Sequence, residues 1–451
     1  MPPATDTIAA IATPAGRGAL GVIRISGPLT RQIVQGLAGP LPSPRAASLR
    51  NFRTAADGGV LDQGLLLWFP GPHSFTGEDV AELQGHGGPV VLDLLLRAVC
   101  AQGARIARPG EFSERAFLNG RMDLAQAEAI ADLIDAASAE AATAALRSLE
   151  GEFSRRVTAI VEALTQLRIH VEGALDFSDE DIPWLAHEAL RLQLTAVIER
   201  LQELLGQAAQ GRRLREGITL TLTGQPNVGK STLLNRLAGT DAAIVTEIAG
   251  TTRDTLRENI VLSGIPLTIV DTAGLRESED AIEREGIRRA WQALEKAEIA
   301  LFLVDDRVGL TETDRALLKK LPDSVQPLVV GNKCDLSLRA AGHATEAGYS
   351  IIRLSAARGD GVQALIEEIL RRTGALTRME GVFSARTRHV EALQHALSSA
   401  AAARQHLEQG ASAELAAEEL RLAQQALGEI TGEFTSDDLL GRVFSQFCIG
   451  K

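Results

Sequence analysis

Apolar and polar residues follow three different patterns along the chain. Up to residue 121, short apolar runs such as Leu20–Ile25 and Leu65–Phe69 alternate with turns rich in Gly and Pro. Runs of this length between turn residues predict strands, here mixed with helices. The sequence therefore predicts an N-terminal α+β domain over residues 1–121.

A helical pattern follows in residues 122–215 and returns in residues 376–451. Apolar positions recur at intervals of three and four residues, which predicts one buried face of a helix. Two such series are Leu124, Ala127, Ile130, Ala131 and Ile134, and Leu194, Val197, Ile198, Leu201, Leu204 and Leu205. The texture between about Arg386 and Leu427 is similar. We expect one helical domain made of these two parts.

Residues 216–375 alternate short apolar runs with helical stretches, which predicts βαβ units and a mostly parallel sheet. A helix is expected from near Gly361 to Arg372. The expected strands are Ile218–Thr223, Leu267–Asp271, Ile299–Asp305, Leu328–Gly331 and Ile351–Leu354. Because helical texture flanks this region on both sides, we predict an α/β domain inserted into the helical domain. Insertion is tolerated where the two ends of the inserted domain lie close together.

Composition favours a cytoplasmic protein. Hydrophobic residues make up 45% and charged residues 23% of the 451 residues, as in globular proteins. No apolar stretch is long enough to cross a membrane, and we expect no signal peptide. The three cysteines, Cys100, Cys334 and Cys448, are too few and too far apart for a disulfide framework or a zinc site. The net charge of −12 disfavours a protein that coats nucleic acid by charge alone.

One motif predicts a nucleotide site. Gly224–Ser231 fits the pattern G-x-x-x-x-G-K-[ST] between an expected strand and an expected helix, Thr232–Leu237. Backbone N–H groups of such a loop wrap phosphates, and the helix N-terminus adds positive potential. We expect Lys230 to reach the β- and γ-phosphates and Ser231 to coordinate Mg²⁺.

A second motif predicts that the base is guanine. Asn332–Asp335 fits N-K-x-D after an expected strand. The carboxylate of Asp335 can accept both the ring N–H and the amine of guanine, whereas adenine would leave it unpaired. Asn332 and Lys333 would brace the loop, and Ser355–Ala356 would contact the guanine oxygen through the backbone.

Two further segments predict how the nucleotide state is sensed. Asp271–Gly274 reads Asp-Thr-Ala-Gly at the end of a strand, where Asp271 would hold Mg²⁺ through water and the N–H of Gly274 would sense the γ-phosphate. Thr252 would complete the Mg²⁺ shell only with GTP bound. Many small GTPases have a water-orienting Gln after this motif, but Leu275 stands here, so another group must orient the water.

The combination of segments resembles the MnmE/TrmE family over essentially the whole chain. The segments that carry the resemblance are Ala12–Gly18, Ser74–Asp79, Glu82–Gly88, Thr246–Asp254, Asp271–Arg276 and Cys448–Lys451. The resemblance implies a K⁺ site made by Asn227, by the backbone oxygens of Thr246 and Ile248, and by Thr251. It also implies that Glu283 positions the attacking water through a bridging water. A cation beside the phosphates would supply the charge that an arginine finger gives elsewhere.

Together, the motifs and the resemblance give one set of expected GTP contacts. These are Asn227, Val228, Gly229, Lys230, Ser231, Thr232, Thr246, Glu247, Ile248, Ala249, Gly250, Thr251, Thr252, Asp271, Thr272, Ala273, Gly274, Asn332, Lys333, Asp335, Ser355 and Ala356.

The resemblance also implies a role in tRNA modification. A homodimer of the chain would join the FAD-binding protein MnmG (GidA) in a heterotetramer and modify the wobble uridine of tRNA at C5. The FAD would be bound by MnmG. The N-terminal domain would dimerise and bind 5-formyl- or methylene-tetrahydrofolate through Arg24, Glu82, Arg121 and Lys451, with Glu78 as a rival to Glu82. Cys448 would be needed for modification and not for GTP hydrolysis.

Two alternatives stay open on the sequence. One is a ribosome-assembly GTPase of the Era/Der group, which shares the switch segments. Such a protein would carry a basic RNA-binding domain after the G domain, but the corresponding region here contains Glu408, Glu414, Glu418 and Glu419. The other is a folate-dependent transferase in which the G domain only regulates, which predicts transfer without the flavoprotein.

Overall fold

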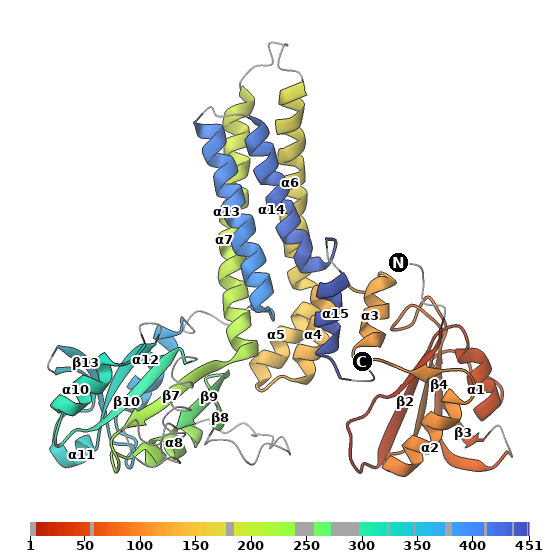
Figure 1. The fold of residues 1–451 in the computed structure, drawn as a ribbon, viewed down its shortest axis with the longest axis horizontal. Coiled ribbons are helices and arrows are strands. Elements are labelled where there is room, and N and C mark those ends of the chain that lie inside the picture. Colours follow the sequence, from red (N-terminus) through yellow and green to blue (C-terminus); the bar gives the residue numbers. More distant parts are fainter. Residues whose placement is uncertain are drawn as a thin grey trace. The chain divides into compact units, whose positions relative to one another are not determined.

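The computed structural model describes residues 6–54, 58–176, 185–239, 257–271, 297–322, 325–346, 348–374, 381–409, 413–434, 437–448 and 450. The chain divides into two compact units (Figure 1). Unit 1 comprises Met1–Ala131, Phe153–Leu194 and Ser398–Lys451, and unit 2 comprises Asp132–Glu152 and Thr195–Leu397.

Unit 1 begins with a six-stranded sheet in the order β3-β4-β5-β2-β1-β6. Its strands are β1 (Ile8–Ile11), β2 (Leu20–Ser26), β3 (Ser48–Arg53), β4 (Val60–Phe69), β5 (Val80–His86) and β6 (Arg105–Ile106). The helices are α1 (Thr30–Ala38), α2 (Pro89–Cys100) and α3 (Glu111–Leu118). Side chains of α1 and α2 share one buried cluster with alternate residues of the strands, so both helices cover the same face of the sheet.

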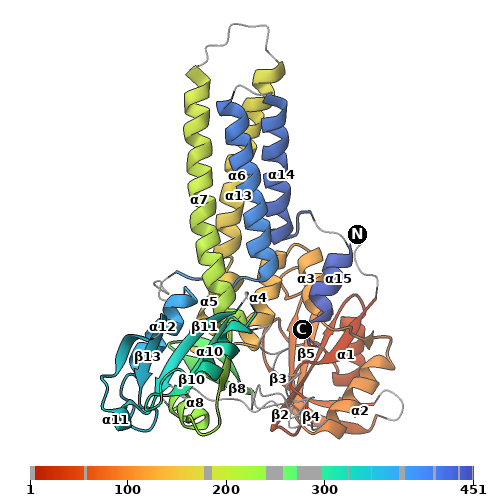
Figure 2. The ribbon, with the colours of Figure 1, turned by 60° about the vertical axis from the view of Figure 1, so that its left-hand side comes forward.

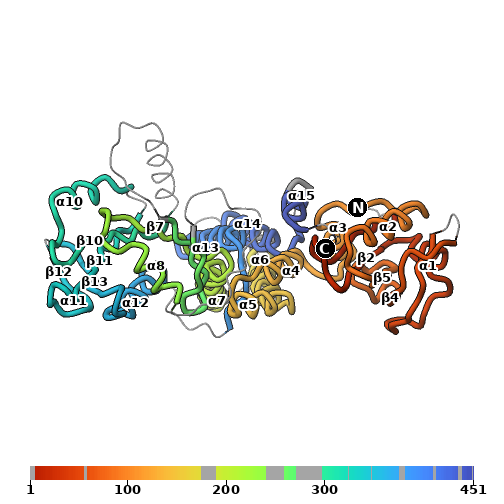
Figure 3. Tube along the Cα trace, turned by 90° about the horizontal axis from the view of Figure 1, so that it is seen from below, coloured from red at the N-terminus to blue at the C-terminus, as the bar shows by residue number. Residues whose placement is uncertain are grey.

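The other helices of unit 1 come from distant parts of the chain. They are α4 (Leu124–Ile134), α6 (Glu152–Asp176), α14 (Ala413–Thr431) and α15 (Asp437–Ser445), with parts of α7 (Leu185–Glu216) and α13 (Thr387–Glu408). Figures 1 and 2 show α6 beside α14, and Gln424 joins them by hydrogen bonds with Thr165 and Arg168. Figure 3 shows α15 beside α3.

A network of buried charges fixes the loop that precedes β5. Arg115 is 4% exposed and donates to the carboxylates of Asp6, Glu78 and Glu111. Burial alone would raise the pKa of Glu111, but hydrogen bonds from Arg105, from the amide of Arg108 and from Arg115 lower it to about 2. Glu111 is therefore ionised at neutral pH, and Glu78 is held as a structural partner of Arg115.

Unit 2 contains a seven-stranded sheet in the order β12-β13-β11-β10-β7-β9-β8. The strands are β7 (Ile218–Gly224), β8 (Arg257–Leu262), β9 (Ile265–Asp271), β10 (Ile299–Asp305), β11 (Gln326–Asn332), β12 (Gly342–Glu346) and β13 (Tyr349–Leu354). The five central strands run parallel, and only the edge strands β8 and β12 are antiparallel. The predicted fold class is confirmed, although neither edge strand was predicted.

Helices cover both faces of this sheet. They are α8 (Lys230–Ala238), α10 (Glu312–Lys319), α11 (Cys334–Ser337) and α12 (Val362–Arg372), and the unit also contains α5 (Ala139–Leu149). Alternate residues of β10 face opposite sides: Leu301 and Leu303 pack with α8 and α12, whereas Phe302 and Val304 pack with α10. This two-sided burial explains why β10 is continuously apolar.

The chain enters and leaves the sheet of unit 2 at one cluster around Asp132. One carboxylate oxygen of Asp132 accepts from Arg215 at 2.7 Å and from Arg386 at 2.8 Å, and the other accepts from Ser384 at 2.7 Å. Asp132 is 8% exposed. The carboxylate thus joins the end of α7, just before β7, to the segment that leads into α13.

Replacing Asp132 tests this junction. Asp132→Ala removes the carboxylate that two guanidinium groups face, and breaking such a buried pair costs about 3 kcal/mol. We expect the opening free energy of the Ser384 amide, measured by hydrogen exchange in the full chain, to fall by about this amount. That amide donates to Ala144 at 3.0 Å.

The matched control is Glu418→Ala. Glu418 pairs with Arg421 on an exposed face, where solvent and salt screen the attraction so that the pair contributes little to stability. Equal and small effects of both substitutions on hydrogen exchange would show that Asp132 does not hold the junction.

Candidate functional sites

The predicted nucleotide-binding residues of unit 2 meet at the carboxyl edge of its sheet. The loop Gly224–Ser231 follows β7, Asn332 ends β11, and Ser355 follows β13. Asp271 ends β9. Since the five strands are parallel, these ends lie on the same edge, where ligands bind in open α/β sheets.

The loop after β7 curls tightly before α8 begins at Lys230. Gly224, Asn227 and Gly229 have φ angles of 146°, 64° and 96°. Successive backbone turns of this kind point N–H groups into a concave anion site. The ammonium of Lys230 donates to the carbonyls of Gly224 at 2.9 Å and Gln225 at 3.3 Å, which holds its charge over the loop.

The side chain of Asn332 ties three loops together. Its Nδ2 donates to the carbonyl of Val228 at 2.8 Å, and its Oδ1 accepts from the amides of Lys333 and Ala356 at 2.9 Å each. A Cβ on Gly229 would lie 2.3 Å from Nδ2 of Asn332, so this position needs glycine. The phosphate loop and the base loop are therefore one hydrogen-bonded assembly.

Lys333 adds a second tie between the same loops. Its ammonium donates to the carbonyl of Asn227 at 2.6 Å and to the carboxylate of Asp305 at 2.9 Å. Hydrogen bonds from Arg307 and Lys333 outweigh the effect of burial and hold the pKa of Asp305 far below its usual range. Asp305 is thus a permanent anion that orients Lys333.

The remaining base-contact candidates lie beside these ties. Asp335 is half-buried in the short helix α11. The amide of Ser355 donates to Asp360 at 2.9 Å, and that of Ala356 donates to Asn332. Both amides already have acceptors within the chain, so a guanine oxygen would have to share one of them.

Several predicted residues lie outside the described part of the chain. They are Thr246, Glu247, Ile248, Ala249, Gly250, Thr251, Thr252, Thr272, Ala273, Gly274, Glu283 and Lys451. The roles that the sequence predicts for them stay predictions. The described part of the nucleotide site is formed by the phosphate loop and the base loops.

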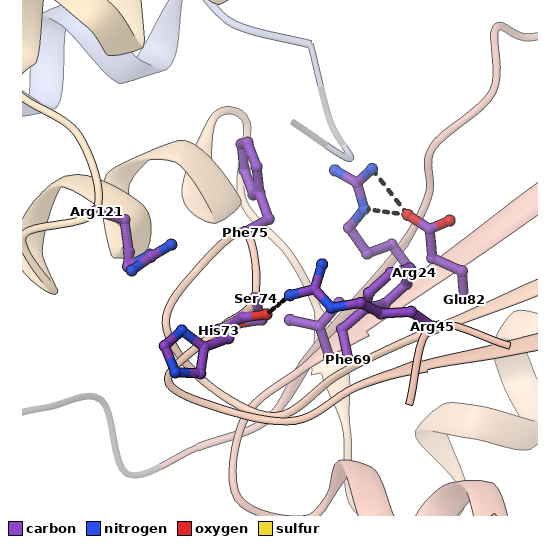
Figure 4. Close-up of a pocket in the computed structure, with 9 residues that line it drawn as sticks. Arg24, Arg45, Phe69, His73, Ser74, Phe75, Glu82 and Arg121 are labelled. Atoms are coloured by element: carbon purple, nitrogen blue, oxygen red, sulfur yellow. Dashed lines mark hydrogen bonds and ion pairs between the residues drawn. The ribbon is translucent and has the colours of Figure 1, made fainter. Parts of the chain in front are cut away.

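Unit 1 contains a pocket of about 280 Å³ in its N-terminal domain (Figure 4). It is lined by Arg24, Arg45, Phe69, His73, Ser74, Phe75, Val80, Glu82 and Arg121. Three of the four predicted folate contacts therefore line one pocket. Arg24 donates from two nitrogens to Oε1 of Glu82, at 3.1 and 3.0 Å, and lies over the rings of Phe75 and Phe112.

Glu78, the rival of Glu82, is engaged elsewhere. Its carboxylate accepts from Arg115 and, at 2.6 Å, from the hydroxyl of Ser26. It does not belong to the pocket lining, whereas Glu82 does. Sequence reasoning did not single out Arg45, Phe69 or His73 as pocket residues. Arg45 lies in the turn before β3, Phe69 ends β4, and His73 lies in the loop that follows. Only the proximity of His73 to the segment Ser74–Asp79 could have pointed to one of them.

The C-terminal residues lie against the same domain. The carbonyl of Cys448 accepts from the amide of Gly110 at 3.3 Å, and the carbonyl of Gly450 accepts from Arg24 at 3.5 Å. Cys448 is exposed. Arg24 of the pocket thus contacts a residue that is two positions from Cys448 in the sequence.

None of the described helices is long and apolar enough to cross a membrane. Among solved structures, a variant of Era from Aquifex aeolicus bound to GDP and AlF₄⁻ matches at 25% identity and a TM-score of 0.28, over 40% of this chain and 66% of that chain. The G domain of the FeoB iron transporter of T. maritima matches at 22% identity and a TM-score of 0.27, over 34% of this chain and 98% of that one. The chain thus spans just under two thirds of the Era structure.

Two family models match the chain in succession. The model described as the N-terminus of the GTP-binding protein TrmE matches residues 7–121, and the model of the MnmE helical domain matches residues 124–448. The first covers the domain with the pocket, and the second covers the helices and the inserted domain with its phosphate and base loops. The chain therefore belongs to the MnmE/TrmE family.

Proposed function

We propose that the chain is the GTP-hydrolysing subunit of a complex that adds an aminomethyl or carboxymethylaminomethyl group to C5 of the wobble uridine of tRNA. It acts in the cytoplasm as a homodimer with the FAD protein MnmG (GidA). The observation that carries this proposal is that one chain combines two features. Asn332 ties together loops that carry guanine-nucleotide motifs, and Arg24 of a separate pocket binds the carbonyl of Gly450, two residues from Cys448.

The GTP half of the proposal rests on the charges at the sheet edge. On binding, Lys230 exchanges its two carbonyl partners for the β- and γ-phosphates, which are stronger acceptors because they are charged. Ser231 and Thr252 hold Mg²⁺, and Asp271 holds it through water. The residue after the Asp-Thr-Ala-Gly motif is Leu275, so water is positioned by Glu283. Asn227, Thr246, Ile248 and Thr251 would hold K⁺ when two G domains meet, and the cation would supply positive charge beside the phosphates.

The folate half rests on the lining of the pocket. Arg24, Glu82 and Arg121 bind 5-formyl- or methylene-tetrahydrofolate together with Lys451. Glu82 accepts from Arg24 on one oxygen and from Gln84, at 3.3 Å, on the other, and it keeps lone pairs for the amine and ring N–H of a pterin. The folate supplies the one-carbon unit, and FAD stays on MnmG.

Potassium dependence tests the GTP half. We expect turnover of GTP by the full-length protein to be at least about tenfold faster in KCl than in NaCl of equal ionic strength, because only K⁺ fits the proposed site. A factor of ten is about 1.4 kcal/mol of transition-state stabilisation. Asn227→Ala should abolish the difference between the two salts and leave the slow turnover in NaCl.

The matched control is Asn227→Gly. Asn227 has a left-handed backbone with φ of 64°, which strains alanine but not glycine. If Asn227→Gly keeps the stimulation by K⁺, the effect of alanine comes from loop geometry and the side chain does not bind the cation. Equal turnover in both salts by the unmodified protein would remove the K⁺ site and favour a GTPase of the Era/Der type.

Substitutions of Glu82 and Glu78 distinguish a residue of the proposed folate site from a residue that stabilises the fold. Glu82→Gln should weaken binding of 5-formyltetrahydrofolate at least about tenfold with little change in Tm, because Glu82 lines the pocket and a factor of ten is only about 1.4 kcal/mol. Glu78→Gln should lower Tm, because Glu78 faces the buried Arg115 and breaking such a pair costs about 3 kcal/mol. Binding is measured by calorimetry on the full chain. Unchanged binding by the Glu82 variant would exclude that residue from the folate site.

Substitution of Cys448 tests whether uridine modification needs the thiol while GTP hydrolysis does not. Cys448→Ser should abolish uridine modification by the chain together with MnmG, GTP, tetrahydrofolate cofactor and tRNA, read by nucleoside mass spectrometry. GTP turnover should stay within about twofold of the unmodified protein, because Cys448 belongs to unit 1 and the nucleotide loops to unit 2. Full modification by the serine variant would contradict a chemical role for the thiol. Modification without MnmG would favour the transferase alternative.

A further inference from the structure

The pocket of unit 1 carries positive charge that its own carboxylate does not neutralise. Glu82 forms an ion pair with Arg24 at 3.0 Å. Arg45 and Arg121 also line the pocket, and neither forms an ion pair among the residues that the structure describes. The lining therefore contains three guanidinium groups and one carboxylate, which favours an anionic ligand.

Arg45 is held in this pocket by a strained backbone. Its φ of 62° lies in the left-handed region, which long side chains rarely adopt. The turn is fixed because its amide donates to the carbonyl of Trp68 at 2.8 Å. Its guanidinium lies 6.0 Å from the centre of the Phe69 ring and donates to the carbonyl of His73. Backbone strain of this kind is common at ligand-binding sites.

Arg31 shows that stacking on an aromatic ring does not by itself require such strain. Its guanidinium lies 5.6 Å from the centre of the Trp68 ring, but Arg31 belongs to the helix α1 and does not line the pocket. Of these two stacked arginines, Arg45 in its left-handed turn is the one whose side chain lines the pocket. Glycine at this position would relieve the strain and remove the cation.

The two ends of the pocket differ in chemistry. Figure 4 shows the Arg24–Glu82 pair on one side and His73 with Arg121 on the other, and the guanidinium of Arg45 lies between them. The stem of Arg121 passes about 3.3 Å from where a Cβ of Gly77 would stand. A volume of about 280 Å³ is at the low end for pockets of drug-sized ligands. A ligand longer than this volume would therefore extend beyond the pocket.

We propose that this pocket selects folates that carry several glutamyl residues, and that Arg45 and Arg121 bind the carboxylates of the glutamyl chain. The proposal rests on the folate site proposed above. The pterin lies toward Glu82, whose oxygens accept its N–H groups, and the chain of carboxylates runs along the side of Arg45. A planar guanidinium binds a carboxylate with two parallel hydrogen bonds, so Arg45 recognises the chain by geometry as well as charge.

The test compares two ligands with the full-length protein. We expect 5-formyltetrahydrofolate with three glutamyl residues to bind about tenfold more tightly than the form with one, which is about 1.4 kcal/mol. In the variant Arg45→Gly the ratio should fall to about two. Arg45→Lys should keep an intermediate ratio, since it retains the charge and loses the planar fork. The ratio should also shrink as salt is raised, because charges at the mouth of a pocket are screened.

Controls separate recognition from structure. Arg45→Gly should keep or raise Tm, because it relieves the left-handed turn, whereas a purely structural arginine would lower it. Arg31→Ala should leave the ratio near ten. Equal affinity for the two folates, or an equal loss of the ratio in the Arg31 variant, would overturn the role of Arg45 while leaving the folate site standing. Failure of the unmodified protein to bind either folate would overturn the folate site and, with it, this inference.

Discussion

The carboxylate of Asp132 fixes the place where an inserted domain leaves and rejoins the helices of this chain. An insertion needs its two ends side by side, and here both ends meet one buried acceptor that binds Arg215, Ser384 and Arg386. Close backbone packing also stabilises this junction. A Cβ on Gly211 of α7 would stand 1.9 Å from the carbonyl of Phe383, so only glycine lets the returning segment approach. The hydroxyl of Ser148 in α5 also donates to the carbonyl of Ser384.

The same helix α5 contacts the turn between β8 and β9, at the sheet edge opposite the one that carries the phosphate and base loops. A Cβ on Gly264, in the turn between β8 and β9, would stand 2.5 Å from the carboxyl carbon of Glu140 in α5. The hairpin β8–β9 lies in the chain between residues 240–256 and 272–296, which hold the predicted switch residues. Helix α5 therefore contacts both this turn and the returning segment 382–384. Because closely packed elements transmit strain, a displacement of the hairpin would press on α5. The hydrogen bonds of Asn332 and Lys333 fix the phosphate and base loops independently of that hairpin.

The parallel core of unit 2 could be predicted from the sequence because burial on both faces leaves continuous apolar runs. The five predicted central strands agree with the observed ones to within two residues at each end. The edge strands β8 and β12 escaped prediction because one face of each is solvated and β12, with the sequence Gly-His-Ala-Thr-Glu, has no apolar run. The helix α15 lies within the predicted helical region 376–451 but was not delimited there, since its short apolar stripe is completed by packing on α3 and α4.

The nucleotide site could be predicted from the sequence, whereas most of the pocket in unit 1 could not. Loops that bind phosphate and guanine need particular residues at fixed spacings, so Lys230, Asn332 and Asp335 could be found from the sequence alone. The pocket of unit 1 is assembled from three strands and the loops beside them, and its residues Arg45 and His73 carry no local pattern. Its shape depends on which of these segments meet, and Arg115 holds the loop before β5 by its ion pair with Glu78.

Arg24 connects the pocket to the C-terminal residues, because its guanidinium lines the pocket and also donates to the carbonyl of Gly450. Gly450 fits only as glycine, with φ of 98° and a Cβ position 2.6 Å from the carbonyl of Ile11. Its carbonyl and the carboxylate of Glu82 share the guanidinium of Arg24. A ligand that competes for Glu82 or for Arg24 must therefore alter the balance between these two acceptors. Because Cys448 is only two residues from Gly450 in the sequence, Arg24 is a direct contact between the lining of the pocket and the C-terminal segment that carries the thiol.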